Sequence, residues 1–85
     1  MNVHDEIVAV VQAHLDVFAE VEALDVEMRR SLNADARRQK LPWILNGRPE
    51  LAVEELRVWR SLHSGELTKA NAIICMQSLM SSYYS

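Results

Sequence analysis

One apolar stripe near the N-terminus constrains the fold more than any other feature. Residues 3–32 contain neither glycine nor proline. When they are placed at the angular step of an α-helix, about 100° per residue, their apolar side chains gather on one face. The stretch shows no sustained alternation of apolar and polar residues, so helix is favoured over strand despite the many valines. The sequence therefore predicts one long amphipathic helix from Val3 to about Leu32.

The apolar face spans about half of this helix, wider than the seam of a two-stranded coiled coil, and so predicts several neighbours. Several of its residues also follow the alternating three-and-four spacing of packed helices. A chain of 85 residues has a thin core, and self-association is a common way to complete it. We therefore expect a homodimer built along the first helix. Its predicted interface consists of Val10, His14, Val17, Phe18, Val21, Leu24 and Met28.

A connector is expected to follow the first helix. A break is predicted near Asn33, and residues 34–40 either form a short helix or continue the first one. Pro42 disfavours helical geometry at the residue before it, and Asn46-Gly47 is a typical turn dipeptide. The apolar run Trp43-Ile44-Leu45 lies between these two signals, inside a predicted loop.

The rest of the chain predicts two helices joined by a tight turn. Pro49 suits the first turn of a helix that extends to His63, and Ser64-Gly65 suits its end. Thr68 is a good N-cap for the last helix. Glu55 points into the apolar arc of its helix and is interpreted as a residue at the rim of the core. The predicted buried faces contain Leu51, Ala52, Leu56, Val58, Trp59 and Leu62, and then Ala72, Ile73, Met76, Leu79, Met80 and Tyr83.

The fold class predicted from these elements is all-α, in a single domain of residues 1–85. It is a small helical bundle with a long N-terminal helix, a basic connector with a possible short helix, and a C-terminal helical hairpin. The net charge of −3 is unevenly distributed over it. Residues 1–27 contain seven acidic residues and no lysine or arginine, whereas residues 28–48 contain six bases and one acid.

The basic connector is the main candidate for a binding site. Its cations either contact a protein partner, pair with the acidic first helix, hold nucleic-acid phosphates while Trp43 stacks on a base, or are simply solvated. The net acidity favours protein over nucleic acid. Tryptophan and arginine are enriched among residues that dominate interfaces, although Trp43 could instead cover the core as a lid. The predicted partner-binding residues are Arg37, Arg38, Trp43, Ile44 and Leu45.

Catalytic and metal chemistry find little support in the sequence. The three histidines and Cys75 lack the close spacing of metal ligands, and two glycines cannot form a glycine-rich phosphate loop. Cys75 has no evident base beside it, and no pair of carboxylates suggests an acid/base couple. We therefore expect no enzyme, no cofactor and no metal. His14 is interpreted as a hydrogen-bonded core or interface residue, or alternatively as part of a pH-sensitive interface.

The expected location is the cytoplasm. Cys75 is the only cysteine, the N-terminus lacks the pattern of a secretory signal, and no apolar run approaches the roughly 20 residues that cross a bilayer. The expected function is that of a non-catalytic protein-binding module, which sequesters, inhibits or chaperones a partner through helical faces and the Trp43 loop.

The alternative is a small DNA-binding transcriptional regulator. It would use the basic segment from Arg29 to Lys40, or the C-terminal hairpin, which has the spacing of a helix-turn-helix. In the second case Thr68, Lys69 and Asn71 would meet the DNA, although the acidic Glu66 beside them is unfavourable near phosphates.

Overall fold

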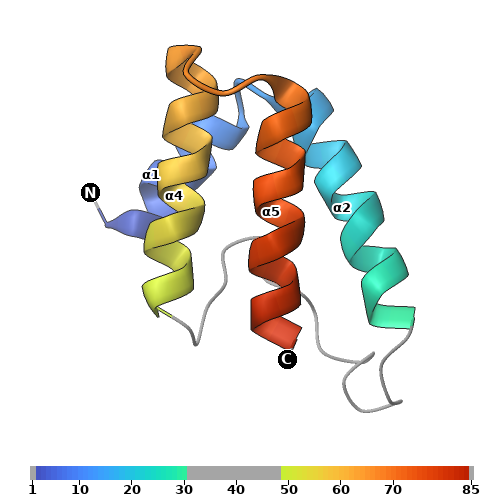
Figure 1. The fold of residues 1–85 in the computed structure, drawn as a ribbon. Helices are drawn as coiled ribbons and strands as arrows, with labels where there is room; N and C mark the ends of the chain where they lie inside the picture. Colours follow the sequence, from blue (N-terminus) through green and yellow to red (C-terminus); the bar gives the residue numbers. More distant parts are fainter. Residues whose placement is uncertain (1, 31–48, 85) are drawn as a thin grey trace.

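Helices account for the regular structure in the part of the chain that the computed structural model describes, residues 2–30 and 49–84. They are α1 (Val3–Val11), α2 (Leu15–Arg30), α4 (Pro49–Ser64) and α5 (Lys69–Tyr84), and no strand occurs within these residues (Figure 1). This confirms the predicted all-α class. The short helix considered for residues 34–40 lies outside the described residues.

The prediction of one continuous N-terminal helix is wrong, because the chain breaks between Val11 and Leu15. At the break, the amides of Ala13 and His14 each bond the carbonyl three residues earlier, at 3.0 and 2.9 Å. Such bonds tighten and end the last turn of a helix. The carbonyl of His14 then accepts from the amide of Phe18 at 3.0 Å, which starts α2.

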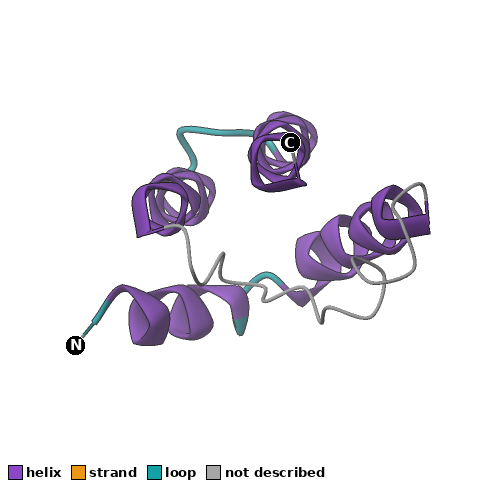
Figure 2. Ribbon diagram, turned by 90° about the horizontal axis from the view of Figure 1, so that it is seen from below, coloured by secondary structure: helices purple, strands orange, loops and turns teal. Residues whose placement is uncertain are grey.

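Packing explains why the helix breaks where no glycine or proline stands. α1 packs on α4, whereas α2 packs on α5, and the two C-terminal helices pack on each other. Figure 2 shows α1 lying across α4, while α2 lies beside α5 in another direction. A straight rod would reach only one of these partners. Burying Ile7 on one side of the break and Val17 on the other stabilises by roughly 1.5–3 kcal/mol each, more than a tightened turn costs.

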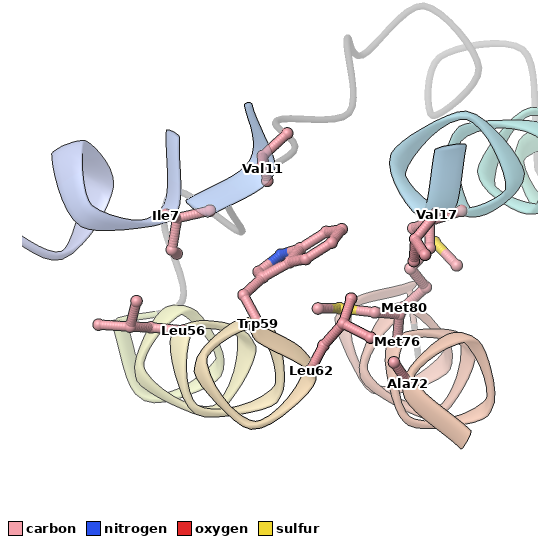
Figure 3. Close-up of a cluster of buried hydrophobic side chains, with 10 residues drawn as sticks. Ile7, Val11, Val17, Leu56, Trp59, Leu62, Ala72, Met76 and Met80 are labelled. Carbon is pink, nitrogen blue, oxygen red and sulfur yellow. The ribbon is translucent and has the colours of Figure 1, made fainter. Parts of the chain in front are cut away.

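Trp59 lies at the centre of the core, with 1% of its surface exposed. Its indole extends from α4 into the space between α1 and the methionines of α5 (Figure 3). The apolar faces predicted for α4 and α5 point inward as expected. The buried cluster consists of Ile7, Val11, Val17, Val21, Leu56, Trp59, Leu62, Ala72, Met76 and Met80.

The turn between α4 and α5 forms as its residues predict. Gly65 has a φ of 84°, in the left-handed region where a side chain is unfavourable. The amide of Glu66 bonds the carbonyl of Ser61 at 2.9 Å, which satisfies a carbonyl in the last turn of α4. Thr68 caps α5 by accepting from the amide of Asn71 at 3.1 Å. The two helices consequently run antiparallel, side by side (Figure 1).

Two carboxylates are buried in this small core. The interpretation of Glu55 as a rim residue is wrong: it is 3% exposed and accepts from the indole N–H of Trp59 at 3.1 Å. Asp25 is 1% exposed and accepts from the hydroxyl of Tyr84 at 2.7 Å. A buried carboxylate requires such hydrogen bonds, because losing its hydration is costly. The two donors, Trp59 on α4 and Tyr84 on α5, lie on helix faces that pack in or against the core.

Candidate functional site

The outer side of α2 carries a line of exposed apolar residues. Leu15 and Val26 are 56% and 37% exposed, and the exposed Ala19 and Ala23 lie between them. Residues three and four apart are neighbours on a helix surface, so these four form a continuous line, here called the α2 stripe. The opposite side of the same helix faces the core through Val17.

Charged residues border the α2 stripe. Part of it lines a shallow, open depression together with Phe18, Glu22, Glu27 and Arg30. Glu20, Glu22 and Glu27 are exposed beside the stripe, and Arg30 is exposed at the end of the helix. Alanine side chains allow another helix to approach closely, since the spacing of packed helices depends on the side chains at the contact. Small-molecule sites are usually concave and enclose most of the ligand, so a shallow, open surface of this kind is better suited to contact with another protein.

A second depression lies between α2 and α5. Its walls include Val17, Ala70, Ile73 and Ile74, and Ile74 is 61% exposed. At its edge, Lys69 and Asp16 form an ion pair that joins the starts of the two helices.

This ion pair shifts the titration of both partners. The hydrogen bond from Lys69 lowers the pKa of Asp16 below its usual value, and the same bond raises the pKa of Lys69. Both side chains are largely exposed, so the pair orders the local surface and adds little stability.

His14 and His63 form a contact that the sequence did not predict. The Nε2 atom of His14 lies 3.0 Å from Nδ1 of His63, and the rings meet edge to face with centroids 5.2 Å apart. The contact joins the break between α1 and α2 to the last turn of α4. His14 is thus hydrogen-bonded within the chain, in line with the first of its two interpretations. Within residues 2–30 and 49–84, no three histidine, cysteine or acidic residues group as metal ligands would.

The predicted partner-binding residues lie outside the described part of the chain. These are Arg37, Arg38, Trp43, Ile44 and Leu45.

The residues predicted to form a dimer interface face mostly inward. Val17 and Val21 are buried within the single chain, and His14 is half-buried against His63. The other four are partly buried and pack against the same core: Val10, Phe18, Leu24 and Met28.

Sequence reasoning missed the α2 stripe. Its signal was present, because Leu15, Ala19, Ala23 and Val26 follow spacings of four, four and three. The signal was weak because two of the four residues are alanines, which are common on exposed and buried helix faces alike. Only the direction of α5 decides which side of α2 is covered.

No family model, curated protein or solved structure matches this chain. Function must therefore be inferred from the chemistry of the surfaces described above. None of the described helices is both long and apolar enough to cross a lipid bilayer.

Proposed function

We propose that the chain is a non-catalytic protein-binding module, which docks a protein partner on the α2 stripe and thereby sequesters, inhibits or chaperones it. The observation that carries this proposal is the alignment of exposed Leu15 and Val26 with two exposed alanines on one helix. Exposed apolar residues that stand singly, such as Val8 and Val53, need no explanation. A continuous line with a charged border is typical of a binding surface.

The stripe alone supports only weak binding. Covering the exposed parts of Leu15 and Val26 contributes about 2 kcal/mol in total, by area. A useful affinity therefore needs the polar border or a second contact. Residues 31–48 follow α2 directly in the chain, and the predicted contacts of Arg37, Arg38 and Trp43 would supply that second contact.

Self-association along the N-terminal helices stays a prediction, but the surface available for it differs from the one predicted from the sequence. Val17 and Val21 are covered by the chain's own core, so a second copy could reach them only by displacing α5. A homodimer would use the outward α2 stripe instead.

The DNA-binding alternative is less well supported by the described residues. α4 and α5 run antiparallel, whereas the helices of a helix-turn-helix cross steeply. Lys69, the cation at the start of α5, is paired with Asp16. An exposed glutamate, Glu66, also lies in the turn between the two helices.

Site-specific photo-crosslinking in cells tests the proposed docking surface. A photoreactive residue at Ala23 is expected to yield a defined adduct with a protein partner, and one at Val53, exposed on α4, is not. Val26→Asp in the Ala23 background should abolish the adduct, whereas Val53→Asp in the same background should leave it unchanged. Both positions are exposed, so the circular dichroism spectrum should be retained. Equal adducts from the two positions, or none from Ala23, would contradict the proposal.

A further inference from the structure

We propose that the segment docked on the α2 stripe is a basic amphipathic helix. This inference rests on the proposed function and specifies the chemistry of the partner. It is drawn from the charges that border the stripe, the length and small residues of the stripe, and the acidity that a second copy would bring.

The border of the stripe is acidic once internal pairs are taken into account. Glu6 is paired with Arg60 on α4, and Asp16 with Lys69 on α5. Glu20 likewise lies beside Lys69, in the depression between α2 and α5. Arg60 and Lys69 therefore neutralise acids of the N-terminal helices and do not neutralise the acids beside the stripe. The exposed acids that line the depression along the stripe are Glu22 and Glu27, against Arg30 at the helix end.

The position of these glutamates fits a partner with cations on both flanks of an apolar line. Glu22 lies on one side of the stripe, and Glu27 lies on the other. A helix that presents apolar residues to Ala19 and Ala23 would place its flanking lysines or arginines opposite these acids. Complementary charge of this kind sets orientation and accelerates association more than it adds affinity.

The shape of the surface favours a helix over an extended strand. From Leu15 to Val26 the stripe extends over about 16 Å, or three helical turns. An added strand would need an edge of unpaired backbone groups, and the middle of α2 offers none. The two alanines, four residues apart, leave room for the side chains of an adjacent helix to interdigitate.

A second copy of this chain is a poorer occupant. In a parallel pairing along the stripe, it would bring Glu22 and Glu27 of one subunit close to the same two residues of the other. Like charges across an interface cost affinity, and Arg30 alone provides positive charge among the described side chains of this surface.

Two synthetic helical peptides of about 18 residues, roughly five turns, provide the test. They share one leucine and alanine stripe, but lysine and arginine flank it in the first peptide and glutamate in the second. Each is titrated into the isotope-labelled full chain and followed by the chemical shifts of the backbone amides. The basic peptide is expected to bind at least about tenfold more tightly, with shifts concentrated on α2. Raising NaCl from about 50 to about 500 mM should weaken its binding several-fold, because these charges are exposed.

Reversing the charge of two glutamates beside the stripe measures how much these acids contribute to peptide binding. The double variant Glu22→Lys/Glu27→Lys should lose about tenfold in affinity for the basic peptide and gain affinity for the acidic one. Glu66→Lys is the matched control, since Glu66 is an exposed acid in the turn before α5, and it should leave both affinities unchanged.

Several results would overturn the inference. Equal binding of the two peptides, or binding of neither, would show that the acidic border does not select a basic helix. Shifts concentrated on α4 would place the docking surface elsewhere. Stripe shifts that depend on the concentration of the chain alone would identify a second copy as the occupant. Tighter peptide binding by Arg37→Glu/Arg38→Glu would identify the chain's own basic segment. If the photo-crosslink from Ala23 to a protein partner is still observed, the proposed docking function stands, and only the inference that the partner presents a basic helix fails.

Discussion

Asp25 and Glu55 illustrate what a small core requires of single residues. Carboxylates are rarely buried, and each of these two accepts a hydrogen bond from an aromatic side chain. Trp59 follows Glu55 by one helical turn, so their contact is local and could have been predicted from the spacing. Tyr84 reaches Asp25 from the other end of the sequence, and only the packing of α2 on α5 brings them together. The first burial was therefore predictable, and the second was not.

Tyr84→Phe tests the buried contact of Asp25. Removing one hydroxyl donor to a buried carboxylate should lower the free energy of unfolding by about 1.5–3 kcal/mol, measured by urea denaturation. Tyr83→Phe is the matched control, because Tyr83 is the adjacent half-buried tyrosine, and its loss should be below about 0.5 kcal/mol. Equal effects of the two substitutions would show that the Asp25 contact contributes nothing specific.

At the scale of elements, the break between α1 and α2 is the main departure from the predicted fold. Both ends of α4 and the start of α5 were predictable because caps, glycine and proline act over a few residues. The break at residues 12–14 carries no such residue. It arises because the two halves of one apolar stripe pack against helices that lie in different directions.

Leu15→Pro distinguishes this break from a continuous helix. Proline is tolerated at the first position of a helix, so the variant should lose less than about 1 kcal/mol of unfolding free energy. Within a continuous helix the same change would cost about 3 kcal/mol or more. Ala19→Pro, inside α2, is the control and should show that larger loss, measured by thermal and urea unfolding.

At the scale of the whole molecule, four described helices cover an apolar stripe that was expected to need a second chain. Val17 and Val21 are buried within one chain, because the break turns α2 onto α5. Most of the residues predicted to form a dimer interface are therefore buried or partly buried within the single chain. The α2 stripe lies on the far side of the same helix and is exposed in the part of the chain that the structure describes.

The stability of Val17→Ala at different protein concentrations separates a core residue from an interface residue. The substitution removes two buried carbons and should lower the free energy of unfolding by about 2–3 kcal/mol. If Val17 belongs to the core of one chain, this loss is the same at micromolar and at near-millimolar protein. If it holds a dimer, the midpoint of unfolding rises with concentration. Sedimentation of the wild type over the same range provides the independent measure of mass.

The sequence by itself determined the helical class, both ends of α4, the N-terminal cap of α5, and the buried faces of these two helices. Each of these depends on the helical period or on contacts within one turn, which a linear pattern contains. The tertiary structure decided where the N-terminal stretch breaks, that Val17 and Val21 pack within one chain, and which side of α2 faces outward. These features depend on the directions of helices far apart in the sequence. No local pattern records those directions, because they follow from the packing of all the helices at once.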